Sequence, residues 1–142
     1  MNMRPSVISS VMIGALVLIA IALGLSVAGG PKAGRLEKED KVRAEDIARL
    51  AGKYVPCLAE EAGRHLPERL FEDDVCFNSL TGIRLADPHS GAPYRYERIS
   101  DTRFRLCASF HRADRVAMHL LGGLDFDADT GCLSATYYGG SD

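Results

Sequence analysis

The sequence lacks the short motifs that identify most catalytic and nucleotide-binding sites. None of its four histidines is spaced as H-x-x-x-H or H-E-x-x-H, the arrangement that places two zinc ligands on one helix face. No serine has the surroundings of a nucleophile elbow, and no glycine-rich stretch has the spacing that cradles phosphate. We therefore expect no catalytic residues, no cofactor, no small-molecule substrate and no enzymatic activity.

Charge is also absent from one long stretch of the chain. No Asp, Glu, Lys or Arg lies between Arg4 and Lys32, so 35 of the 36 such residues belong to residues 32–142. The chain is thus an apolar segment joined to a polar domain of about 110 residues, which is large enough for one modest core. The net charge of −2 gives no support for nucleic-acid binding, and no nucleic-acid partner is expected.

The apolar segment from Val7 to Ala28 has the length of a membrane span. It contains 22 residues, and about 20 apolar residues in a helix cross the hydrocarbon core. The alternative is a cleaved signal peptide, because Ser26 and Ala28 have the small-residue spacing of a cleavage site. A run longer than the usual apolar region, preceded by Arg4 alone, favours a retained anchor.

The four cysteines decide which side of the membrane we expect the domain to occupy. No pair is spaced C-x-x-C, and an even number behind a membrane segment favours two disulfides in an extracytoplasmic domain. Order and spacing favour Cys57 with Cys76 and Cys107 with Cys132. Lysines and arginines instead favour a cytoplasmic domain with reduced cysteines, because more of them follow the segment than precede it. We give the cysteines more weight, because domains often cross despite flanking charge.

Hydrophobic periodicity predicts a helix over residues 35–63. Its apolar stripe recurs at steps of three and four, whereas charged residues such as Asp46 are expected on other faces. The stripe comprises Ile47, Leu50, Ala51, Tyr54 and Leu58. Pro56 should kink this helix, and a short helix is expected from Pro67 to about Phe71. Residues 73–83 are expected to be irregular.

Alternation with period two predicts a β-hairpin further along the chain. Tyr94 to Glu97 and Arg103 to Phe110 alternate apolar and polar residues around the polar break at residues 100–102. The apolar face of a lone hairpin needs cover, which the upstream helix can provide. A helical turn within 116–121 and a last strand over 133–138 complete an α+β domain with a small antiparallel sheet.

Two charged groups are candidate binding sites in this domain. Four arginines line the hairpin and form either a charged solvent face or a surface for an anionic partner: Arg95, Arg98, Arg103 and Arg105. Alternating carboxylates at Asp125, Asp127 and Asp129 can converge on a calcium ion. The match to an EF-hand loop is poor, because glycine falls at the seventh position and Thr136 at the twelfth. The alternative is a solvated acidic turn.

The stretch from Asp87 to Tyr96 resembles a segment of the major pseudopilins of type II secretion systems, Asp-Pro-x-(x)-Gly-x-Pro-Tyr-x-Tyr. It is more similar still to a segment of uncharacterised bacterial membrane-anchored proteins with a pseudopilin-like domain, in which a strand like Phe104 to Phe110 follows. The resemblance covers residues 41–135 in the order of elements, with about 25 specific residues. It implies a helix packed on a small sheet, and a structural calcium near the C-terminal end of the domain.

The apolar segment departs from that family. It lacks glutamate and the glycine-containing processing motif, and a Gly-Pro cluster over residues 29–34 should interrupt the helix. We expect an anchor at residues 1–30, a juxtamembrane linker at 31–40 and an extracytoplasmic domain at 41–142. The predicted protein is single-pass in a bacterial inner membrane, with a periplasmic domain that acts through protein contacts in an envelope or secretion-type assembly. The alternative is an accessory single-span subunit of another membrane complex.

Overall fold

The structure, a computed structural model, describes residues 5–27 and 30–139. The chain divides into two compact units, Met1–Leu36 and Glu37–Asp142. The first unit contains the apolar segment, and the second contains the whole sheet.

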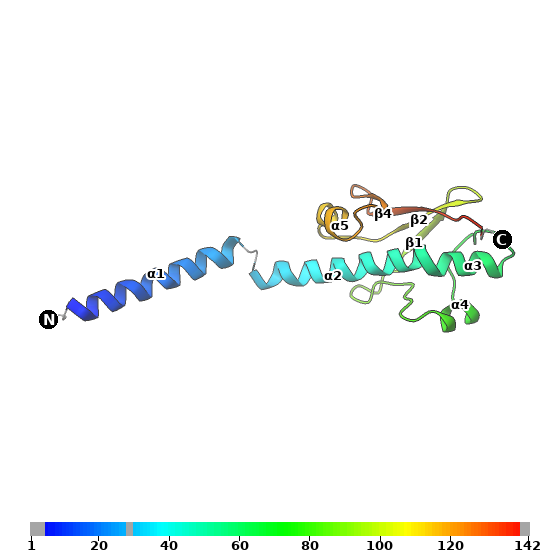
Figure 1. Cartoon of the computed structure of the whole chain (residues 1–142). Helices are drawn as coiled ribbons and strands as arrows, with labels where there is room; N and C mark the ends of the chain where they lie inside the picture. The colour runs from blue at the N-terminus through cyan, green and yellow to red at the C-terminus, as the bar shows by residue number, and fades with distance from the viewer. Residues whose placement is uncertain (1–4, 28–29, 140–142) are drawn as a thin grey trace. The chain divides into compact units, whose positions relative to one another are not determined.

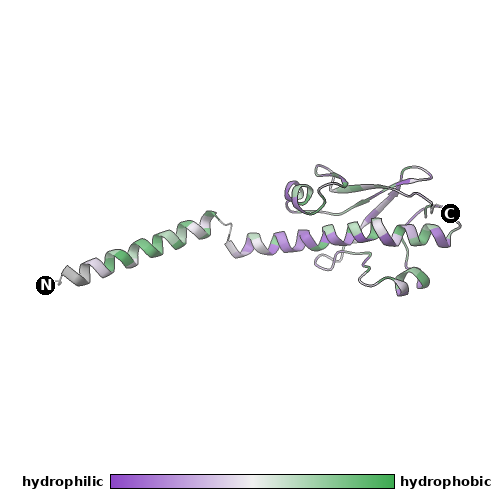
Figure 2. Ribbon diagram, viewed as in Figure 1, coloured by the Kyte–Doolittle hydropathy of each residue, from purple (hydrophilic) through white to green (hydrophobic). Residues whose placement is uncertain are grey.

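Helix α1 (Pro5–Val27) forms the apolar part of the first unit. Every side chain described in it, from Ser9 to Val27, is exposed, and Figure 2 shows the helix coloured as hydrophobic along most of its length. Among the described residues, one helix is long and apolar enough to cross a membrane. The expected end of the apolar segment, at Ala28, lies outside the described residues.

The predicted linker is helical. Helix α2 (Gly30–Arg49) begins inside the Gly-Pro cluster, where Gly30 has a φ of +63° and Pro31 occupies the first turn. Proline is tolerated there because the first N–H groups of a helix have no partner within it. The second compact unit begins at Glu37, so part of the stretch expected as linker belongs to the domain.

The domain is built on one long helical run that changes pitch in its middle. Helix α2 continues as a π-helix, η1 (Leu50–Tyr54), and then as α3 (Val55–Glu61). The backbone N–H of Val55 donates to the carbonyl of Leu50, five residues back, just before Pro56. A proline ring would collide with the carbonyl four residues earlier in a regular helix, and the wider turn accommodates it. The run ends near Gly63, which has a φ of +72°.

Two local predictions after this helix are wrong. Residues 67–71 are not helical, whereas helix α4 (Asp74–Ser79) occupies a stretch that we expected to be irregular. The Asp73 carboxylate caps α4 by accepting from the backbone N–H groups of Val75 and Cys76, both at 3.0 Å. That cap satisfies N–H groups that would otherwise lack partners, which explains why the short helix forms there.

The sheet has four antiparallel strands in the order β1-β2-β4-β3. The predicted hairpin is β1 (Arg95–Arg98) with β2 (Arg103–Cys107), and the predicted last strand is β4 (Cys132–Thr136). Strand β3 (Asp125–Asp127), which pairs with β4, lies in the acidic segment and was not predicted. Helix α5 (Ala113–His119) joins β2 to β3, near the expected helical turn.

The core lies between the long helix and one face of the sheet, as Figure 1 shows. Tyr54 and Ile47 from the helix and Phe104, Leu106 and Leu133 from the sheet are almost completely buried. On the side of the helix away from the sheet, the loop before α4 is fixed to it, because the Tyr54 hydroxyl donates to the Phe71 carbonyl at 2.8 Å. The apolar stripe therefore packs as predicted, within an α+β domain.

Both predicted disulfides are present. Cys57–Cys76 joins α3 to α4, and Cys107–Cys132 joins directly opposed residues of β2 and β4. Each link closes the excursion that the sequence placed between its cysteines.

Removing either disulfide should destabilise the domain, because the links close loops with sequence separations of 19 and 25. Loops of that length restrict the unfolded chain by about 3 kcal/mol each, although the entropic origin of this figure is model-dependent. We expect the Cys57→Ala/Cys76→Ala and Cys107→Ala/Cys132→Ala pairs to lower the urea midpoint of the full chain in detergent micelles. An unchanged midpoint in both pairs, with non-reducing peptide maps confirming the parent's links, would contradict this expectation.

Candidate functional site

A cluster of buried charges lies where the long helix meets the loop that leads into β1. Asp40, Arg43 and Asp87 have exposed fractions of only 2%, 5% and 5%. The Arg43 guanidinium donates from Nη1 to Asp40 at 3.0 Å and from Nε to Asp87 at 2.9 Å. A buried charge is costly unless it is paired and hydrogen-bonded, and here one cation is shared by two carboxylates.

Asp40 also binds the backbone of the segment that follows β2. Its carboxylate accepts from the N–H of His111 at 2.9 Å and from the N–H of Arg112 at 2.7 Å. These N–H groups precede α5, a short helix whose N-cap position has no side-chain cap. Asp40 thus connects the beginning of the domain helix to the segment that follows β2.

Asp87 organises the turn of the Asp-Pro-His-Ser-Gly stretch. Its carboxylate accepts from the backbone N–H of His89 at 3.0 Å and from the Ser90 hydroxyl at 2.6 Å, while Gly91 takes a φ of +73° to close the turn. Burial opposes ionisation of Asp87. The hydrogen bonds from Ser90, His89 and Arg43 outweigh it and lower the pKa to about 2.

A second buried carboxylate, Asp46, fixes the strand that follows this turn. It is 1% exposed and accepts from Nε and Nη2 of Arg84 and from the Tyr94 hydroxyl, the latter at 2.8 Å. Burial, and then the hydrogen bond to Asp46, raise the pKa of Tyr94. Our expectation that Asp46 lies away from the packed face is wrong, because Arg84 and Tyr94 supply partners that make its burial tolerable.

A pocket of about 540 Å³ opens beside this cluster. Its walls come from the Asp87 turn, the start of β1, the segment after β2 and the β3–β4 turn, with Arg43, Arg95, Phe110 and His111 among the lining residues. The hydrogen-bonding groups of Arg43 are directed to Asp87 and Asp40, so this side chain forms part of the pocket wall. Arg95 is exposed, and its Nη2 lies 3.8 Å from Cys132 Sγ. The lining of the pocket therefore includes an exposed cation, Arg95, and an aromatic ring, Phe110.

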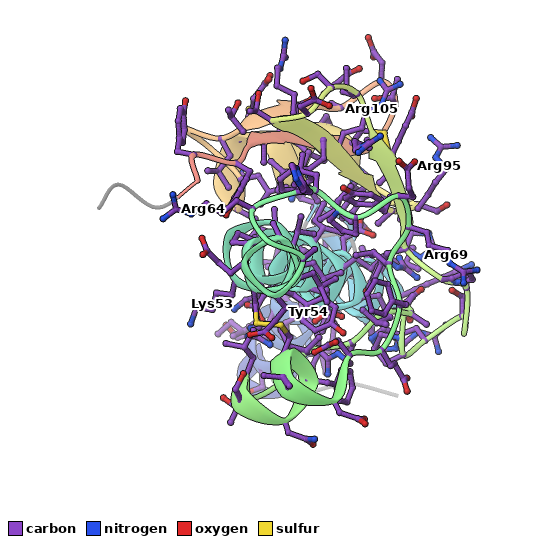
Figure 3. All side chains as sticks on the ribbon, turned by 90° about the vertical axis from the view of Figure 1, so that its right-hand side faces the viewer. Lys53, Tyr54, Arg64, Arg69, Arg95 and Arg105 are labelled. Carbon is purple, nitrogen blue, oxygen red and sulfur yellow. A yellow bond between two sulfur atoms is a disulfide. The ribbon has the colours of Figure 1, made fainter. Side chains whose placement is uncertain are left out.

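The four arginines of the predicted partner surface do not share one face. Register and alternation place Arg95, Arg103 and Arg105 on the face of the sheet away from the helix, and Arg98 on the opposite face. Arg98 is paired with Glu68 and donates to the Leu66 carbonyl, so it is structural. We call the other face the outer sheet face; Figure 3 shows Arg95 and Arg105 on the sheet side of the domain.

The acidic segment is largely strand and tight turn. Asp125 and Asp127 lie in β3, and the Asp127 carboxylate accepts from the Asp129 N–H at 2.9 Å and from the Thr130 hydroxyl at 2.7 Å. These bonds lower the pKa of Asp127, with the Thr130 bond contributing most. Within residues 5–27 and 30–139, no group of three or more His, Cys, Asp or Glu side chains is close enough to hold a metal. Calcium binding here stays a prediction.

Sequence reasoning missed the buried cluster, although one signal was present. Asp40 and Arg43 lie seven and four residues before Ile47, so the apolar stripe extends backward onto both of them. Charged residues on the packed face of a helix indicate buried pairing. The chain matches no protein-family model, no curated protein and no solved structure.

Asp87→Asn should remove a pH-dependent contribution to stability. The folded pKa of about 2 lies below the ordinary 3.8, so the stabilisation is present above about pH 4 and is lost as the pH falls through 2. We expect the free energy of unfolding of the variant to be about 2 kcal/mol lower than that of the parent at pH 7. Between pH 5 and pH 2, this free energy should change less in the variant than in the parent. Urea unfolding of the full chain in micelles, followed by near-ultraviolet circular dichroism, measures both quantities.

Asp101→Asn is the matched control for this measurement. Asp101 is an exposed carboxylate in the β1–β2 turn, and it makes no side-chain hydrogen bond or ion pair with the part of the chain that the structure describes. Its substitution should leave the pH profile of the parent intact. Equal profiles for Asp87→Asn and the parent would show that Asp87 does not carry the effect.

Proposed function

We propose that this protein is a membrane-anchored extracytoplasmic domain that acts through protein contacts in an envelope or secretion-type assembly. The observation that carries the proposal is the coupling of α1, apolar and exposed at every described side chain from Ser9 to Val27, to a small domain with two disulfides. Exposed apolar surface of that extent is stable in lipid, and disulfides persist in oxidising compartments.

The buried charges support a role in recognition. Arg43, Asp46 and Asp87 direct their hydrogen bonds inward and fix the shape of the loop beside the pocket. A rigid surface loses less conformational entropy when it binds a partner. On the outer sheet face, Arg95 and Arg103 are exposed and Arg105 is paired with Glu97 at 2.9 Å. We infer that this face, together with the pocket at its edge, contacts an anionic surface of a partner protein.

The first test is topology. Protease added to spheroplasts should remove residues 32–142. Protein isolated from untreated cells should still contain α1 at its N-terminus. Full protection until the membrane is lysed would contradict the extracytoplasmic placement. A mature N-terminus at Gly29 would contradict the retained anchor and show that the segment is a signal peptide.

The second test is capture of partners from native membranes after cross-linking. Arg95→Glu combined with Arg103→Glu reverses the charge of the outer sheet face and should abolish the captured partner, because like charges across an interface are repulsive. Lys53→Glu is the control, since Lys53 is exposed on the helix and away from the sheet (Figure 3). Equal recovery of the partner with the double arginine variant and with Lys53→Glu would show that the outer sheet face does not bind the partner.

The identity of the partner distinguishes the alternative function. Components of an envelope or secretion machine support the proposal, whereas recovery of one unrelated membrane complex in fixed ratio indicates an accessory subunit. In that case the apolar segment contributes to docking, and capture should depend on the sequence of α1 as well as on the domain.

A further inference from the structure

Three large apolar side chains are exposed within seven consecutive residues at α5 and the turn after it. Met118, Leu120 and Leu124 have exposed fractions of 67%, 38% and 53%. Leu121, the one buried side chain between them at 3% exposure, holds the segment on the core. Arg115 is exposed on the same helix and makes no side-chain hydrogen bond or ion pair with the described residues. We call Arg115, Met118, Leu120 and Leu124 the α5 patch.

The α5 patch lies at the end of the domain where the chain enters it. The backbone N–H groups of His111 and Arg112, directly before α5, donate to Asp40, and the His111 ring lies 3.2 Å from Glu39. Asp40 is the fourth residue of the second compact unit. Figure 1 shows α5 beside the middle of α2 and α4 at the other end of the domain, near α3.

Few residues separate this end of the domain from the apolar helix α1. Glu39 follows Val27, the last residue of α1, by twelve positions. Twelve residues span about 20 Å as a helix and at most about 40 Å when fully extended. A bilayer that holds α1 is therefore separated from Glu39, whose side chain contacts the segment before α5, by no more than this length of chain.

We propose that the α5 patch binds the surface of the lipid bilayer in which α1 is anchored. Its apolar side chains enter the interfacial region and Arg115 meets lipid phosphates, which is the combination found in interfacial helices. Lys32 and Lys38, both exposed in the connection, add positive charge that anionic headgroups attract. The contact fixes the orientation of the domain above the membrane, and leaves the outer sheet face for a protein partner.

The absence of tryptophan from the chain permits a direct test. Met118→Trp and Leu120→Trp each place a single fluorophore in the α5 patch of the full chain, reconstituted in nanodiscs. Lipids brominated on their acyl chains quench tryptophan that enters the bilayer. We expect both variants to lose emission in brominated nanodiscs and to emit at shorter wavelength than in water. We expect Arg115→Glu, added to Met118→Trp, to reduce the loss when the lipid is anionic.

Val75→Trp is the matched control. Val75 is an apolar residue, 58% exposed, in α4 at the other end of the domain, and its tryptophan should emit equally in brominated and ordinary lipid. Equal emission from the patch variants in the two lipids would overturn the proposal, and so would equal quenching at all three positions. Non-reducing peptide maps of each variant show whether both disulfides have formed. If Leu120→Trp misfolds, Met118→Trp still tests the proposal, because Met118 is the more exposed of the two positions.

This inference rests on the membrane anchorage in the proposed function, and the experiment separates the two failures. A chain that does not co-elute with nanodiscs refutes the anchor and, with it, the contact. A chain that co-elutes but shows unquenched patch tryptophans refutes the contact alone. Quenching without any captured partner in native membranes supports the contact and leaves the protein-assembly role as the part that failed.

Discussion

The architecture of the domain depends on the buried guanidinium of Arg43. It joins Asp40 and Asp87, and through them it connects the domain helix, the turn before β1 and the segment after β2. Desolvating three charges is unfavourable, and it is offset only because nearly every lone pair and N–H in the cluster has a partner. Removal of Arg43 would leave two buried carboxylates without their shared cation, at a cost of about 3–5 kcal/mol. The cluster thus permits one arrangement of the three segments.

The disulfides complement this cluster where the apolar core is thin. Strands of three to five residues make a small sheet, and a four-stranded sheet of that size needs support from the helix beneath it. Cys107–Cys132 joins the two central strands, and Cys57–Cys76 holds α4 on the opposite side of the helix. Charge pairing therefore fixes one end of the domain, while covalent links fix the sheet and the other end.

This division of roles explains how a small anchored domain can present distinct surfaces. The buried cluster shapes the pocket and stiffens the Asp87 turn, and the outer sheet face carries the exposed Arg95 and Arg103. The α5 patch lies near the chain's entrance, fixed there by Asp40. On the proposed functions, one surface meets lipid and another meets protein, and the rigid core keeps their relative orientation constant within the domain.

Local patterns in the sequence were sufficient for much of this fold. Period-two alternation located β1 and β2, the step of three and four residues located the packed face around Ile47 and Tyr54, and cysteine order gave both disulfides. Strand β3 and the burial of Asp46 could not be obtained in this way. A three-residue acidic strand forms only because β4 offers it hydrogen bonds, and a carboxylate is buried only because distant residues such as Arg84 and Tyr94 meet it in the folded chain. Short-range periodicity records which face of an element is apolar, whereas partners far apart in sequence are brought together only by tertiary packing.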